Sequence, residues 1–143
     1  MSRVLFVCVQ NAGRSQMAEA LFTAAAKGRH EARSAGTAPA ERVHPEVVAA
    51  MSELGFRLEN RVPRKLDRSD AEWADVVVTM GCGDECPCIP GKRYVEWELT
   101  DPHGLSDDEV HRIRDDIAGR TRALAAELDA QQGSSTLRPC SSA

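Results

Sequence analysis

The stretch that decides the fold is RVLFVCVQNAGRSQMAEALFTAAAK, residues 3–27. Its first part, Arg3 to Val7, is an apolar run that predicts a buried strand. Residues 15–27 carry apolar side chains at helical spacing, which predicts an amphipathic helix. A short segment holding Cys8 and Gly13 connects the two. The chain therefore opens with a strand, a glycine-containing loop and a helix.

A loop of this kind is a predicted anion site. Several backbone N–H groups converge where a helix begins, and the helix dipole favours negative charge there. Arg14 follows Cys8 in this loop and can bind two oxygens of an oxyanion through its guanidinium. The same surroundings favour the thiolate form of Cys8, which is the nucleophilic form. The alternative is that Cys8 is only a small buried hydrophobe and Arg14 a surface charge.

The rest of the chain alternates between strand-like and helix-like segments. The predicted strands are residues 3–7, 31–34, 76–80 and 93–97, and the predicted helices are residues 15–27, 45–54, 69–73 and one that begins after Ser106. A capping-box pattern that starts at Ser69 marks the short third helix. This alternation predicts an α/β fold, with a parallel four-stranded sheet flanked by helices. We expect one domain over residues 1–130 and a flexible C-terminal tail over residues 131–143.

Composition limits the class of protein. The chain has 143 residues, of which 42% are hydrophobic, enough for one core. The net charge is −4 and the charges are interspersed, so we expect no nucleic-acid partner. No early apolar run is long enough for a signal peptide or a membrane span, so we expect a cytoplasmic protein, and a monomer. In reducing surroundings, cysteines usually serve catalysis, redox exchange or metal binding.

A second group of cysteines follows the third predicted strand. Cys82, Cys86 and Cys88 lie within seven residues of a glycine-containing loop. If this loop reaches Cys8, the thiols can exchange disulfides in sequence. The competing interpretation is a zinc site with His103 as a fourth ligand, but paired Cys-x2-Cys knuckles are missing, so we expect no metal. The remaining histidines, His30, His44 and His111, have no partner that the sequence identifies, and we expect them to be solvated.

Asp101 precedes a proline just after the last predicted strand. In a parallel sheet, the segments after Cys8, after the third strand and around Asp101 all leave at the carboxyl edge, where ligands bind. An aspartate that faces an anion site can keep a proton for a leaving oxygen and act as a general acid. The alternative is that Asp-Pro is an ordinary turn.

These motifs together resemble the thioredoxin-coupled arsenate reductases, which have the low-molecular-weight tyrosine phosphatase fold. The motifs are Cys8 to Glu19 with its Arg-Ser-Gln-Met-Ala-Glu segment, Ser34-Ala35-Gly36, the cysteine loop and Asp101-Pro102. The resemblance covers about Arg3 to Leu128. It implies an enzyme that converts arsenate to arsenite, has no tightly bound cofactor, and takes electrons from thioredoxin.

The resemblance also implies roles for individual residues. Cys8 attacks arsenate, Asp101 protonates the departing oxygen, and Ser15 helps hold the thiolate. Cys82 then attacks Cys8 and releases arsenite, and Cys86 resolves the Cys8–Cys82 disulfide, with Cys88 as the alternative. Arsenate binds to the loop that consists of Cys8, Val9, Gln10, Asn11, Ala12, Gly13, Arg14 and Ser15, with Asn11 ordering it.

The chain also departs from the family pattern. Some members bind potassium beside the anion loop through residues matching Asn11, Glu19, Ser34 and an aspartate. Arg64 stands in the last position here, so we expect a guanidinium in place of the cation. A mycothiol-dependent reductase is another possibility within the family, although those enzymes usually lack the outer cysteines. Outside it, the alternatives are a phosphatase that acts on phosphotyrosine-like monoesters and a zinc-binding or thiol-based regulator.

Overall fold

The computed structural model describes residues 1–81 and 91–131. The strands are β1 (Arg3–Cys8), β2 (Glu31–Gly36), β3 (Val76–Thr79) and β4 (Arg93–Glu96). The helices are α1 (Arg14–Ala26), α2 (Pro45–Ser52), α3 (Arg68–Trp73) and α4 (Asp107–Ala130). The strands pair in the order β2-β1-β3-β4, and every pair is parallel. The predicted parallel four-stranded sheet is confirmed.

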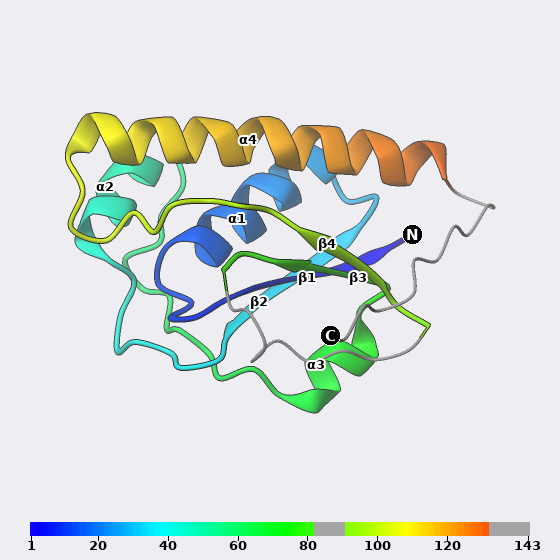
Figure 1. Cartoon of the computed structure of the whole chain (residues 1–143). Helices are drawn as coiled ribbons and strands as arrows, with labels where there is room; N and C mark the ends of the chain where they lie inside the picture. Colours follow the sequence, from blue (N-terminus) through cyan, green and yellow to red (C-terminus); the bar gives the residue numbers. More distant parts are fainter. Residues whose placement is uncertain (82–90, 132–143) are drawn as a thin grey trace.

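Helices cover both faces of the sheet. Helices α1, α2 and α4 lie on one face and α3 on the other (Figure 1). Alternate residues of β1 point to opposite faces, as the pleat of a strand requires. Val4 and Phe6 therefore pack in the core beneath α1 and α4, and Leu5 and Val7 pack toward α3. Because both faces are covered, β1 is apolar along nearly its whole length, as the sequence indicated.

The end of α2 and the cap of α3 differ from the sequence prediction. Helix α2 ends at Ser52, two residues before the predicted end, and Gly55 follows with a φ of +88°, where glycine is favoured. The N-cap of α3 is Asp67, whose N–H donates to the Asp70 carboxylate at 3.1 Å. The predicted cap at Ser69 is wrong, because this serine lies inside the helix and its hydroxyl donates to Asp67.

The topology brings the proposed site together at one edge of the sheet. Cys8 and Gly36 are the last residues of β1 and β2 and lie opposite each other in register. Val7 lies opposite Thr79, the last residue of β3. The carboxyl ends of these strands therefore lie at one edge of the sheet, which is where parallel α/β sheets bind ligands.

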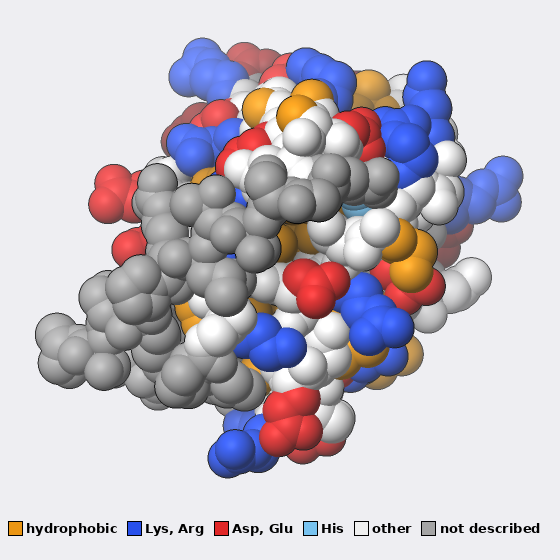
Figure 2. Space-filling view, turned by 90° about the vertical axis from the view of Figure 1, so that its right-hand side faces the viewer, with side chains coloured by type: hydrophobic (Ala, Val, Ile, Leu, Met, Phe, Trp, Pro, Cys, Tyr) orange, Lys and Arg blue, Asp and Glu red, His pale blue; other side chains and the backbone are white. Residues whose placement is uncertain are grey.

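The described surface carries charges of both signs. Figure 2 shows acidic and basic side chains interspersed over one face of the molecule. Within residues 1–81 and 91–131, no helix has the length and apolar character needed to cross a lipid bilayer.

His30 ties the start of β1 to the end of α4. Its side chain is fully buried, its Nδ1 accepts a hydrogen bond from the Ser2 N–H at 3.0 Å, and its Nε2 bonds Asp129 at 2.8 Å. The expectation that His30 is solvated is therefore wrong. Both partners are far away in the sequence, so no local pattern could reveal them.

The Asp129 carboxylate makes part of the stability dependent on pH. The hydrogen bond from Arg29, and then the bond to His30, hold the pKa of Asp129 below its ordinary value. A lowered pKa stabilises the fold above the unfolded value of about 4, and this contribution is lost as the pH falls through the folded value. We therefore expect the difference in free energy of unfolding between wild type and Asp129→Asn to be larger at pH 7 than at pH 3.

Urea unfolding at the two pH values measures this difference. Asp116→Asn is the control. It also removes one charge from α4, and within residues 1–81 and 91–131 Asp116 pairs with Arg120 alone. A wild-type to Asp129→Asn difference that is the same at both pH values would show that this carboxylate carries no pH-dependent stability.

Candidate active site

The loop between β1 and α1 turns its carbonyl groups away from the site. The carbonyl oxygens of Cys8, Val9, Gln10 and Ala12 accept hydrogen bonds from backbone N–H groups of residues 37, 38, 40 and 44, at 2.8–3.2 Å. In a planar trans peptide the N–H points opposite to the C=O. The N–H groups of Val9, Gln10, Asn11 and Gly13 are therefore directed to the other side of the loop. The predicted anion site requires N–H groups directed to one side of the loop in this way.

Cys8 lies at the start of this loop. It is buried, and its Sγ accepts a hydrogen bond from the Asn11 N–H at 3.3 Å. The Ser15 Oγ lies 2.9 Å from the same sulfur and itself accepts a bond from the Asn11 side-chain amide at 2.7 Å. Because Ser15 accepts from Asn11, its own hydrogen is free to point at the sulfur. The Asn11 N–H and the Ser15 hydroxyl thus both contact the Cys8 sulfur at the start of a helix.

Asn11 is held so firmly that its amide orientation is defined. Its Oδ1 accepts from the backbone N–H of Arg64 at 2.9 Å and from the Gln16 side-chain amide at 3.1 Å. A backbone N–H can only donate, so the atom facing Arg64 is oxygen and the amide nitrogen faces Ser15. Asn11 also has a φ of +51°, which asparagine tolerates better than most residues. These contacts match the ordering role that the resemblance implied for Asn11.

Sequence reasoning missed Gln16. It is buried in the first turn of α1 and donates to both the main-chain and the side-chain oxygen of Asn11. The available signal was a glutamine that immediately follows the loop at the start of an otherwise apolar helix. The structure places it directly behind the Cys8 hydrogen bonds, in contact with Asn11.

Arg14 approaches the loop from the first turn of α1. Its Nη1 donates to the Leu99 carbonyl at 3.2 Å, and its Nη2 lies 3.9 Å from the Asp101 carboxylate. The Arg14 side chain is only 11% exposed and that of Asp101 is 48% exposed. The His103 N–H holds the Asp101 Oδ1 at 3.0 Å. The structure thus brings Asp101 to the guanidinium of Arg14, at the open side of the site.

Gly81 leaves room for the Arg14 guanidinium. It has a φ of +85°, and a Cβ at this position would lie 2.7 Å from the Arg14 Nη1. We expect Gly81→Ala to displace the guanidinium and to weaken binding of inorganic phosphate by about tenfold or more, since a hydrogen bond to a charged group is worth about 1.5–3 kcal/mol. Calorimetric titration with phosphate measures this loss.

Gly55→Ala is the matched control for Gly81→Ala. Gly55 has a φ of +88°, but a Cβ there meets nothing within 4 Å. Both variants pay about 1–2 kcal/mol in stability for the left-handed conformation. Only Gly81→Ala is expected to lose anion affinity, and equal affinities in the two variants would contradict a role for Gly81 in placing Arg14.

Two arginines surround Glu19 and Ser34 behind the loop. The Arg61 Nη1 donates to Glu19 at 2.9 Å, and the Ser34 hydroxyl donates to the other Glu19 oxygen at 2.6 Å. The Arg64 Nη1 donates to the Ser34 carbonyl at 2.7 Å, while its Nη2 pairs with Asp70. The sequence predicts a guanidinium here from Arg64. The structure adds Arg61, which the sequence did not single out and which makes the contact to Glu19.

Two further histidines, His44 and His111, lie on this side of the molecule. His44 is buried and its ring stacks on His103, with centroids 4.1 Å apart. Burial, and then the charge of His103, lower the pKa of His44. His111 pairs with Glu53 at 2.5 Å. The expectation of a solvated His44 is therefore wrong, because the segment that carries His103 folds back over it.

The predicted cysteines of the relay lie outside the described residues. Cys82, Cys86 and Cys88 fall between residues 81 and 91, and Cys140 falls after residue 131. Their roles therefore stay predictions.

The sequence of this chain is similar to those of proteins named as arsenate reductases. The chain is 41% identical, over 129 residues, to a Halobacterium salinarum protein named "Putative arsenate reductase", covering 87% of this chain and 91% of that protein. It is 31% identical over 131 residues to a glutaredoxin arsenate reductase of Synechocystis, covering 90% and 99% of the two chains.

A solved structure shares the same fold. The thioredoxin-dependent arsenate reductase of Corynebacterium glutamicum is 42% identical and superposes with a TM-score of 0.81, covering 92% of this chain. The chain spans 64% of the length of that structure. The family model for low molecular weight phosphotyrosine protein phosphatase matches residues 3–134, so the chain belongs to this family.

Proposed function

We propose that this protein is an arsenate reductase that uses Cys8 as its nucleophile and is re-reduced by thioredoxin. The observation that carries the proposal is the pair of contacts to the Cys8 sulfur, from the Asn11 N–H at 3.3 Å and from the Ser15 Oγ at 2.9 Å, in a loop whose N–H groups point to one side. The proposed substrate, arsenate, is taken from the names of the relatives. The proposed reductant, thioredoxin, is taken from the name of the Corynebacterium enzyme.

The first step forms a bond between sulfur and arsenic. The Cys8 thiolate attacks arsenate held by the loop N–H groups and Arg14, and one hydroxide leaves as water after taking a proton. We assign that proton to Asp101, and the assignment is supported by the 3.9 Å between its carboxyl group and the guanidinium that would bind the same oxyanion. Arsenic remains As(V) in this covalent intermediate.

Electrons reach arsenic in the second step. The Cys82 thiolate attacks the Cys8 sulfur, a disulfide forms, and the electron pair of the S–As bond stays with arsenic, which leaves as arsenite. The two sulfurs supply the two electrons that take As(V) to As(III). Cys86 then attacks Cys82 and frees Cys8, and the dithiol of thioredoxin reduces the resulting Cys82–Cys86 disulfide.

A phosphatase is the second candidate, and the family membership favours it. A phosphate monoester would need Cys8, Arg14 and Asp101 in the same roles, with water in place of Cys82 as the second attacking group. The outer cysteines have no part in that reaction. They are therefore the residues that separate the two functions.

The proposed function is tested by arsenate-dependent consumption of NADPH with thioredoxin and thioredoxin reductase. We expect turnover with wild type, loss of turnover in Cys86→Ser, and retention in Cys88→Ser. Retention in Cys86→Ser with loss in Cys88→Ser would move the resolving role to Cys88. Turnover with glutathione and glutaredoxin, or with mycothiol and mycoredoxin, but not with thioredoxin would contradict the proposed reductant.

A further inference from the structure

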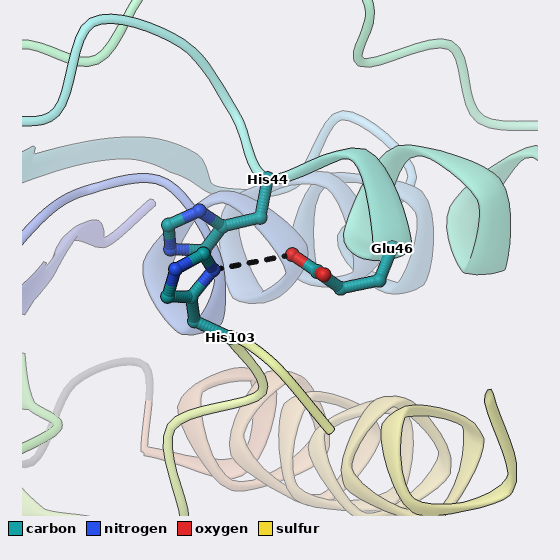
Figure 3. Close-up of side chains that lie close together, drawn as sticks. All are labelled: His44, Glu46 and His103. Atoms are coloured by element: carbon teal, nitrogen blue, oxygen red, sulfur yellow. Dashed lines mark hydrogen bonds and ion pairs between the residues drawn. The ribbon is translucent and has the colours of Figure 1, made fainter. Parts of the chain in front are cut away.

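A group of potential metal ligands lies beside the site and takes no part in the chemistry above. It consists of His44, Glu46 and His103. His44 and Glu46 come from the start of α2, and His103 comes from the turn after Asp101-Pro102. In Figure 3 the two imidazole rings lie one over the other and the Glu46 carboxylate points toward them.

We propose that His44, Glu46 and His103 bind one divalent transition-metal ion of the zinc type. Two neutral imidazoles and one carboxylate are a ligand set that zinc accepts, with the fourth position left to water. Imidazole nitrogen favours zinc, copper, nickel and cobalt over magnesium and calcium, which prefer oxygen ligands. The ligand set therefore selects the class of ion.

The distances fit such an ion after a small adjustment. Ligands of a tetrahedral zinc lie about 3.4 Å from one another, given bonds of about 2.0–2.1 Å. The His103 Nδ1 and the Glu46 Oε1 are already 3.4 Å apart, and the ligand atoms of all three residues lie within 4.8 Å of one another. The His103 side chain is 60% exposed, so its ring is free to rotate out of the stack and close the set.

His44 is the ligand that its neighbours hold in place. His44 is only 8% exposed, and its backbone N–H is fixed by the carbonyl of Ala12 in the anion loop. Its ring nitrogens have no hydrogen-bond partner among residues 1–81 and 91–131. An ion on this cluster would link α2 to the turn that carries Asp101, because the His103 N–H also holds that carboxylate.

The test is a calorimetric titration with Zn²⁺, repeated with Co²⁺ to obtain the visible spectrum of the bound ion. The titrations use a parent variant with the substitutions Cys82→Ser, Cys86→Ser, Cys88→Ser and Cys140→Ser. These remove outer thiols that would compete for the metal. We expect one equivalent to bind, with affinity lowered at least about tenfold in His103→Gln, which removes one of three protein ligands. His111→Gln is the matched control, since His111 pairs with Glu53 away from the cluster.

His103→Gln decides the outcome, because its exposed side chain can be replaced without disturbing the core. His44→Gln is the second variant, and its melting temperature is recorded to separate lost binding from lost folding. Equal zinc affinity in the parent and in His103→Gln would overturn the proposal. So would a parent that binds no stoichiometric ion, or an equal loss of affinity in His111→Gln.

Discussion

Cys8→Ser is expected to remove arsenate reduction by more than about a thousandfold, to the level of the uncatalysed control. Serine keeps the size of the side chain and can still bond the Asn11 N–H and the Ser15 hydroxyl, which the sulfur contacts at 3.3 and 2.9 Å. It cannot supply a stable anion at neutral pH or form a disulfide. The measurement is arsenite release per minute at saturating arsenate.

The fold and the anion loop of Cys8→Ser are expected to survive. Phosphate binding by calorimetry checks the loop, and urea unfolding checks the fold. Cys140→Ser is the control, because Cys140 has no role in the proposed relay. Arsenite production by Cys8→Ser at a rate near that of wild type would exclude Cys8 as the nucleophile.

Cys82→Ser is expected to abolish multiple-turnover arsenate reduction while sparing hydrolysis of a phosphate monoester such as para-nitrophenyl phosphate. The first attack needs only Cys8, Arg14 and Asp101, and an ester intermediate can be released by water. Arsenite release requires a second thiol to take the place of arsenic on Cys8. The two activities of one variant therefore report on the two steps separately.

Either of two results would contradict the role of Cys82. Arsenate turnover in Cys82→Ser near the wild-type rate would mean that another thiol attacks Cys8. Loss of phosphatase activity together with reductase activity would mean that the substitution damages the anion site. If wild type itself hydrolyses no monoester, the state of the anion loop is measured by the rate at which iodoacetamide labels Cys8 with and without phosphate.

Much of the fold could be predicted because its signals are local. The apolar run before Cys8 and the periodicity after it define β1 and α1 to within a residue, and the alternation along the chain predicts the parallel sheet that the structure confirms. The last helix begins directly after Ser106, as predicted, and the Ser106 hydroxyl caps α4 by accepting from the Glu109 N–H. Such signals depend only on neighbouring residues, so they can be identified in the sequence without knowledge of the tertiary fold.

The contacts that were missed depend on residues distant in the sequence. His30 bonds Asp129, which is 99 residues away, and His44 stacks on His103 from another loop. Arg61 reaches Glu19 across 42 residues. Both histidines would be solvated if their local segments were isolated, and only the packing of α4 and of the Asp101 turn buries them.

The candidate site could be predicted in part from the sequence. One continuous segment, from the end of β1 to the first turn of α1, supplies Cys8, Asn11, Arg14 and Ser15, so spacing alone could group them. Placing Asp101 near Arg14 required the inference that the strands are parallel and end at one edge. The support of Asn11 by Gln16 and by the Arg64 N–H could not be predicted, because the direction of a buried amide depends on the partners that the fold brings to it.

The most direct test of the central claim is a single turnover without any external reductant. Fully reduced protein is mixed with excess arsenate, and arsenite and free thiols are counted after quenching in acid. We predict one arsenite and the loss of two thiols per chain, with peptide mapping placing the disulfide between Cys82 and Cys86. A chain that releases no arsenite under these conditions, or releases it without losing thiols, would contradict reduction by the protein's own sulfurs.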